Sequence, residues 1–137
     1  MPHKTTVQEA LIYTMVTMSA VDRIVSDAEL RKIGNIVSQL PVFAKFDTDD
    51  LVKTAEACGN ILSEDDGLET ILETIARVLP KKLYETAYAL AVEVAAVERD
   101  VRQEELRFLE VLRDKLELDK LIIAAIERGA RARHQIP

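Results

Sequence analysis

The sequence predicts an all-α fold, a single compact bundle of about seven helices. Glycine and proline are scarce, with four of each in 137 residues, while 48% of the chain is apolar. Apolar residues recur at helical spacing along most of the chain. No segment alternates apolar and polar residues in the way that a half-buried strand would. One domain is expected to span residues 1–137, because this length suits a single hydrophobic core.

The first predicted helix covers residues 6–21, and from Ala10 to Val21 it is apolar or small on nearly every side. Such a helix is typically buried all round. The next helix is expected to begin at Ser26, because Ser26 and Glu29 have the spacing of a capping box. Its apolar positions continue to Leu40, and Pro41 ends it.

Two further helices follow, each preceded by acidic residues that suit the positive end of a helix dipole. One starts in residues 47–50 and runs to about residue 62. The other starts in residues 63–66 and ends at Pro80. The second of these helices should bury an apolar stripe, made of Leu68, Ile71, Leu72, Ile75 and Leu79.

The last three predicted helices cover residues 83–97, 103–116 and about 119–131. The first of them is almost wholly apolar, so we expect it to be buried like the helix at residues 6–21. The second is amphipathic, with a buried side expected to contain Leu106, Leu109, Leu112 and Leu116.

Two halves of the chain, at about residues 6–40 and 82–116, repeat the same order of buried helix, acidic turn and amphipathic helix. A shift of 76 positions superimposes the turns. Ala20 then matches Ala96, Leu30 matches Leu106, and Asp22 is matched by the acidic Glu98. Two such units packed back to back would cover each other's apolar faces. The sequence therefore predicts pseudo-two-fold symmetry with the two buried helices at the centre.

The acidic turns are the main candidate site. Asp22 and Glu98 each follow the C-terminal end of a buried helix, where the dipole disfavours a carboxylate. A divalent cation such as Ca²⁺ or Mg²⁺ would balance these charges, with oxygen ligands from both turns. The candidate ligands are Asp22, Asp27, Glu29, Glu98, Asp100 and Glu105. The alternative is structural: the carboxylates accept hydrogen bonds from helix N-termini, and Glu29 completes its capping box.

The remaining composition restricts function. A net charge of −6 disfavours nucleic-acid binding, which needs a basic surface. The single cysteine, Cys58, and the polar N-terminus favour the cytoplasm, and no apolar run is long enough to span a bilayer. No zinc-type spacing, phosphate-binding glycine loop or catalytic triad pattern is present, so no enzyme is predicted. The basic end, residues 128–134, is expected to cap the last helix, or else to contact acidic lipid or an acidic partner.

The two turns, Ala-Val-Asp-Arg-Ile-Val-Ser-Asp-Ala-Glu-Leu and Ala-Val-Glu-Arg-Asp-Val-Arg-Gln-Glu-Glu-Leu, resemble those of the TerB-like tellurite-resistance family. The chain departs from that family's common Asp-Gly pair, because Arg23 and Arg99 stand where glycine would be. The resemblance implies an all-helical binding or scaffold domain, linked to tellurite resistance or a bacterial stress response, in the cytoplasm or at the inner face of the membrane. It leaves two alternatives: a pure protein-interaction domain, and an enzyme that uses paired carboxylates on a small metabolite.

Overall fold

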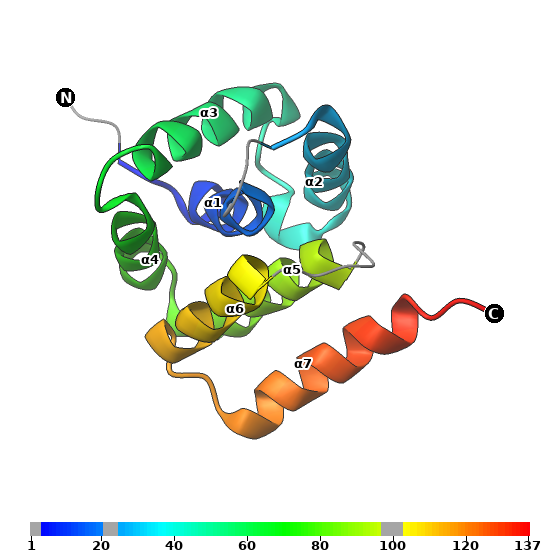
Figure 1. The fold of residues 1–137 in the computed structure, drawn as a ribbon. Helices are drawn as coiled ribbons and strands as arrows, with labels where there is room; N and C mark the ends of the chain where they lie inside the picture. Colours follow the sequence, from blue (N-terminus) through cyan, green and yellow to red (C-terminus); the bar gives the residue numbers. More distant parts are fainter. Residues whose placement is uncertain (1–3, 21–24, 97–102) are drawn as a thin grey trace.

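The computed structural model describes residues 4–20, 25–96 and 103–137, and these residues form an all-helical bundle without strands (Figure 1). The predicted all-α class is therefore confirmed. The α-helices are α1 (Val7–Ala20), α2 (Asp27–Gln39), α3 (Leu51–Leu62), α4 (Gly67–Val78), α5 (Tyr84–Ala96), α6 (Gln103–Lys115) and α7 (Lys120–Arg133). Three 3-10 turns connect them: η1 (Pro41–Phe43), η2 (Thr48–Asp50) and η3 (Lys81–Leu83).

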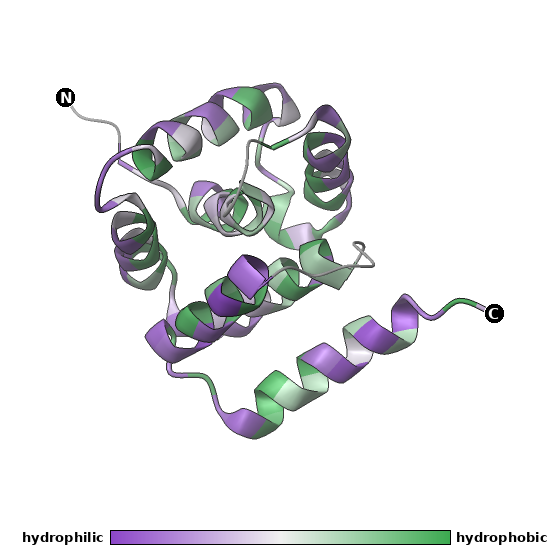
Figure 2. Ribbon diagram, in the orientation of Figure 1, coloured by the Kyte–Doolittle hydropathy of each residue, from purple (hydrophilic) through white to green (hydrophobic). Residues whose placement is uncertain are grey.

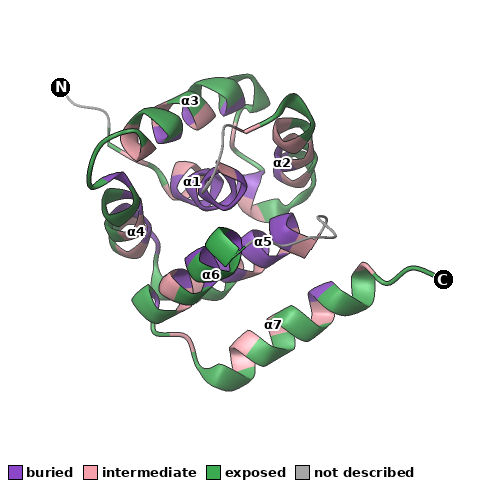
Figure 3. Cartoon of the chain, viewed as in Figure 1, coloured by how far each residue is buried: buried purple, intermediate pink, exposed green. Residues whose placement is uncertain are grey.

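The two apolar helices, α1 and α5, lie at the centre of the bundle and pack against each other, as predicted. Every residue of α1 from Ala10 to Ser19 is buried, which Figure 3 shows as a nearly continuous buried ribbon. Helices α2, α3, α4 and α6 also contact α1. Burial on all sides explains why the sequence of α1 has no polar face.

Helix α7 lies along the outside of the bundle against α5, away from α2, α3 and α4 (Figure 1). Hydrophilic and hydrophobic residues alternate along its ribbon in Figure 2, and Ala130 is its one buried residue. Ile123 and Ile126 pack partly buried against the core. The contact of α7 with the bundle therefore depends on few apolar side chains. None of the helices in the described parts of the chain is long and apolar enough to cross a membrane.

Helix α4 begins at the acidic segment where it was predicted. Asp66 is its N-cap and Gly67 its first residue, while Ser63 is the C-cap of α3. Gly67 is required by a close approach of the two helices. A Cβ atom on Gly67 would lie 2.3 Å from the Ile61 carbonyl oxygen and 2.7 Å from Leu62 Cα. Only a residue without a side chain fits between α3 and α4 here.

Two leucines of the predicted buried faces are exposed. Leu68 is 36% exposed and Leu106 is 50% exposed, so this part of the core prediction is wrong. The reason is their position on the rims of surface hollows. Leu68 lies beside Phe108 and Val111 in a hollow between α4 and α6, and Leu106 lines a groove between α5, α6 and α7.

Candidate functional site

The first acidic turn leads into α2 through the predicted capping box. The Glu29 backbone N–H donates to Ser26 Oγ at 3.1 Å, and the Ser26 N–H donates to Glu29 Oε1 at 3.1 Å. These reciprocal bonds satisfy amides that have no partner within the helix. Glu29 therefore has a structural role at this turn, as the alternative interpretation of the sequence expected.

The six candidate cation ligands are only partly described. Asp22, Glu98 and Asp100 lie outside the described residues. Asp27 is exposed in the first turn of α2, while Glu105 is only 2% exposed near the start of α6. Among the residues that the structure describes, no three His, Cys, Asp or Glu side chains are grouped so that they could hold a metal ion. The cation site thus remains a prediction for the turns themselves.

Cys58 on α3 is a core residue rather than a nucleophile. Its thiol is fully buried and lies 3.5 Å from Thr17 Oγ1 of α1. Burial raises the pKa of the Cys58 thiol to about 11, because a thiolate is poorly solvated in an apolar interior. At neutral pH this thiol is protonated and inaccessible.

A groove opens between the C-terminal part of α1, the start of α2, and α3. We call it the N-terminal groove; its volume is about 500 Å³. The floor from α1 and the start of α2 is made by four apolar residues, Val16, Ala20, Val25 and Leu30. The side from α3 and the residue after it consists of Val52, Ala55, Glu56, Gly59, Asn60, Leu62 and Ser63.

A second groove, of about 640 Å³, lies between α5, α6 and α7 and is called the C-terminal groove. Its floor repeats that of the first, since Val92, Ala96 and Leu106 line it. These residues lie 76 positions after Val16, Ala20 and Leu30, and each pair has the same residue type. The helix bounds follow the same shift, because α1 and α5 end at Ala20 and Ala96, and α2 and α6 begin at Asp27 and Gln103. The internal repeat therefore builds two matching apolar floors.

A third helix lines each groove, outside the predicted repeat halves at residues 6–40 and 82–116. Ala55 and Glu56 of α3 line the N-terminal groove, and Ala130 and Arg131 of α7, 75 positions later, line the C-terminal groove. The same shift relates Gly59 to His134, and both residues also line their grooves. Each groove is thus enclosed by three helices in the same order.

Contacts across the two units match as well. In the first unit, Thr17 of α1 meets Cys58 of α3. In the second, Glu93 of α5 accepts from Arg133 Nη2 of α7 at 2.5 Å. Glu93 lies 76 positions after Thr17, and Arg133 lies 75 positions after Cys58. A buried neutral contact in one half is therefore replaced by a surface ion pair in the other.

His134 strengthens that ion pair, because its Nε2 lies 2.8 Å from Glu93 Oε1. Partial burial acts to raise the pKa of Glu93, but hydrogen bonds from Arg133 and His134 outweigh it and lower the pKa below its usual value. Both oxygens of Glu93 are thus engaged in holding the end of α7 on α5.

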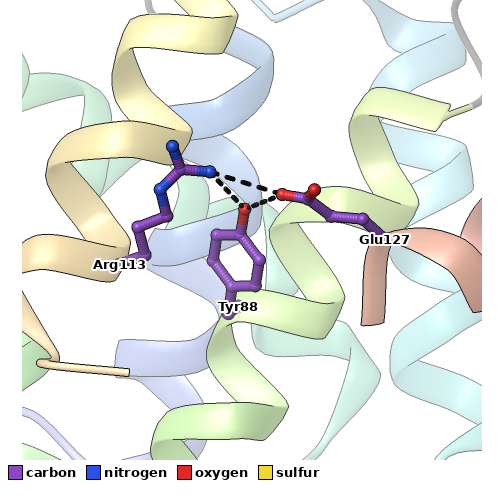
Figure 4. A network of polar contacts seen from close by, with 3 residues as sticks. All are labelled: Tyr88, Arg113 and Glu127. Atoms are coloured by element: carbon purple, nitrogen blue, oxygen red, sulfur yellow. Dashed lines mark hydrogen bonds and ion pairs between the residues drawn. The ribbon is translucent and has the colours of Figure 1, made fainter. Parts of the chain in front are cut away.

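A second polar cluster holds the middle of α7, as Figure 4 shows. The Tyr88 hydroxyl of α5 donates to Glu127 Oε2 of α7 at 2.5 Å, and Arg113 Nη1 of α6 lies 3.4 Å from the same oxygen. Burial and the bond to Glu127 raise the pKa of Tyr88 to about 12. This cluster joins three helices and has no counterpart in the first unit, where Ile12 and Val52 occupy the equivalent positions of Tyr88 and Glu127.

Sequence reasoning missed both grooves. One signal was present: Ala20 and Ala96, and Leu30 and Leu106, are identical pairs within the repeat. Their identity was attributed to core packing, whereas Leu30 is only partly buried and Leu106 is half exposed. No such signal indicated that α3 and α7 line the grooves, because Ala55 and Ala130 are the only identical pair among the lining residues of these two helices compared above.

Comparison of the chain with protein-family models, curated proteins and solved structures finds no match. The resemblance to the TerB-like family therefore stays a prediction.

Proposed function

We propose that the protein is a non-enzymatic binding domain that recognises another protein through its grooves, as a scaffold or adaptor. The observation that carries this proposal is the repetition of an apolar floor at two surface grooves. Core packing does not explain why these residues are repeated, because Leu30 and Leu106 leave apolar surface uncovered in both units. Partly exposed apolar surface in a groove is typical of protein interaction sites.

The chemistry of the grooves supports binding over catalysis. In the C-terminal groove, His134 is paired with Glu93, but no Ser, Thr or Cys is present among the described residues that line it. In the N-terminal groove, Ser63 has no histidine beside it among the described lining residues, and its hydroxyl donates to the Asn60 carbonyl at 2.7 Å. Neither arrangement supplies a nucleophile with an adjacent base.

Photocrosslinking in the cells that make the protein tests this function. A photoreactive amino acid is placed at Val52, which is 52% exposed in the N-terminal groove, and separately at Leu121, which is 78% exposed on α7 and does not line either groove. We expect discrete protein adducts from position 52 and none from position 121.

The substitution Gly59→Leu provides a second test in the same crosslinking experiment. No atom lies within 4 Å of a Cβ added at Gly59, so a leucine there fills the groove without a clash in the fold. It should remove the adducts formed from position 52. Adducts that persist in the filled groove, or equal labelling from both positions, would contradict a groove-directed interaction.

A further inference from the structure

The two grooves share a floor but differ in charge. Glu56 is the one charged residue among the described residues that line the N-terminal groove. At the equivalent place, the C-terminal groove has Arg131, with His134 one helical turn further along α7. The repeat has thus kept the apolar residues and replaced an acidic residue by a basic one at this position, while Glu127 lines the C-terminal groove as well.

Acidic residues also border the N-terminal groove at two of its corners. Exposed Asp27 follows Val25 by two positions, and exposed Glu64, Asp65 and Asp66 follow Ser63 directly. Lys53, the cation of α3 next to Val52, lines a different hollow together with Asp50 and Thr54. Exposed Arg31 directly follows Leu30 of the groove. Acidic residues therefore outnumber basic ones beside the N-terminal groove.

The side formed by α3 suits an approaching helix. Val52, Glu56 and Gly59 are exposed at helical spacing along one face of α3. Gly59 leaves open space where other residues have a side chain. An amphipathic helix can place its apolar side chains between residues at this spacing. Charged residues at the rim then favour a helix of opposite charge.

We propose that the N-terminal groove binds a basic amphipathic helix of a partner protein. This inference rests on the proposed function and names the partner's chemistry. The apolar side chains of the helix would cover Val25, Leu30 and Val52, and its Lys or Arg side chains would face Glu56 and the acidic corners.

A second copy of the chain is a poorer occupant. Its basic helix is α7, with Arg128, Arg131 and Arg133. The apolar side of α7 already packs on α5 of its own chain through Ile126 and Ala130. Docking α7 into another copy would first require its release.

Fluorescence anisotropy with designed peptides tests the proposal. One labelled helical peptide carries leucines on one face and lysines on the other, and a matched peptide carries leucines and glutamates. We expect the Leu/Lys peptide to bind at physiological salt and the Leu/Glu peptide to bind at least tenfold more weakly. Equal affinity for both peptides would overturn the proposed charge selection.

Two matched charge reversals locate the binding. Glu56→Lys should weaken Leu/Lys binding about tenfold. Glu85→Lys makes the same change in net charge at an exposed site on α5 outside the groove, and should weaken binding about twofold at most, because salt screens distant charges. Equal effects of the two substitutions would show attraction to the whole acidic chain and overturn the assignment to the groove.

Two further outcomes separate this inference from the proposed function. If neither peptide binds while the photoreactive residue at position 52 still gives protein adducts, the partner chemistry is wrong and the binding function stands; if adducts are also absent, both fail. Sedimentation equilibrium shows whether the chain self-associates. A dimer that Gly59→Leu dissociates would make a second copy the occupant and overturn the proposal.

Discussion

The attachment of α7 to the bundle should depend strongly on the Tyr88 hydroxyl, and Tyr88→Phe removes that group while keeping the ring. The ring is fully buried, and its hydroxyl donates to Glu127 Oε2 at 2.5 Å. A hydrogen bond to a charged acceptor contributes about 1.5–3 kcal/mol. The Glu127 side chain is 45% exposed and that of Arg113 is 33% exposed, so solvent screening reduces the effect, and we expect a loss of about 1–2 kcal/mol.

Urea unfolding followed by circular dichroism measures this loss, with the m value unchanged because the exposed surface stays the same. The melting temperature should fall by roughly 3–8 °C for a chain of this length. Hydrogen exchange should accelerate mainly in α7, since α1 and α5 remain covered by other helices. Tyr84→Phe is the control, because the Tyr84 hydroxyl donates to the Ala76 carbonyl at 2.7 Å without touching α7.

A double-mutant cycle with Glu127→Gln isolates the pair. The coupling free energy should be about 1 kcal/mol, since each single substitution already breaks the charge-assisted bond. A coupling near zero, or a Tyr88→Phe protein as stable as the wild type, would refute the reasoning that polar contacts hold α7 in place.

Four further measurements follow from the structure. The pKa of Tyr88 is raised from 10.0 to about 12, so the folded state binds this proton more tightly than the unfolded state; stability present below pH 10 should decline as pH rises toward 12, and Tyr88→Phe should flatten that decline. Gly59→Ala should stabilise α3 by about 0.5–1 kcal/mol because the added Cβ meets open space, whereas Gly67→Ala should cost about 1–3 kcal/mol by pushing against the α3 backbone; equal melting shifts would contradict the two packing environments. Cys58 should resist iodoacetamide at pH 8 and react only after denaturation, since burial raises its thiol pKa to about 11; rapid labelling of the native protein would show that α3 opens. Calorimetric titration with Ca²⁺ and Mg²⁺ tests the predicted cation site: heat in the wild type that is lost in Asp22→Asn supports it, and no heat in either protein would leave the acidic turns with a structural role alone.

Much of the fold was predictable because its signals are local. The capping box at Ser26 and Glu29, the apolar surface of α1 all round, and the proline after α2 each determine a boundary through nearby residues. The acidic residues at 63–66 likewise indicate the start of α4, because Asp66 is its N-cap. The need for glycine at position 67 was not predictable, because only the structure shows how close the end of α3 comes to it.

The grooves could not be predicted because a helical pattern does not distinguish a covered apolar residue from an uncovered one. Leu106 and Leu109 occupy the same apolar face of α6, yet Leu106 is 50% exposed and Leu109 is 9% exposed. The difference depends on how α6 packs against α1, α4 and α5. Such positions are set by the packing of whole helices and leave no mark within one segment of sequence.

The complete burial of α1 has a consequence for how the chain folds during synthesis. The partner that covers one side of α1 is α5, and 64 positions separate the end of α1 at Ala20 from the start of α5 at Tyr84. A ribosome adds about 5–20 residues each second. The apolar surface of the newly made α1 is therefore exposed to water for several seconds before α5 is synthesised. During that interval the nascent chain is a candidate client for chaperones, and a fragment that stops before α5 is expected to aggregate rather than fold.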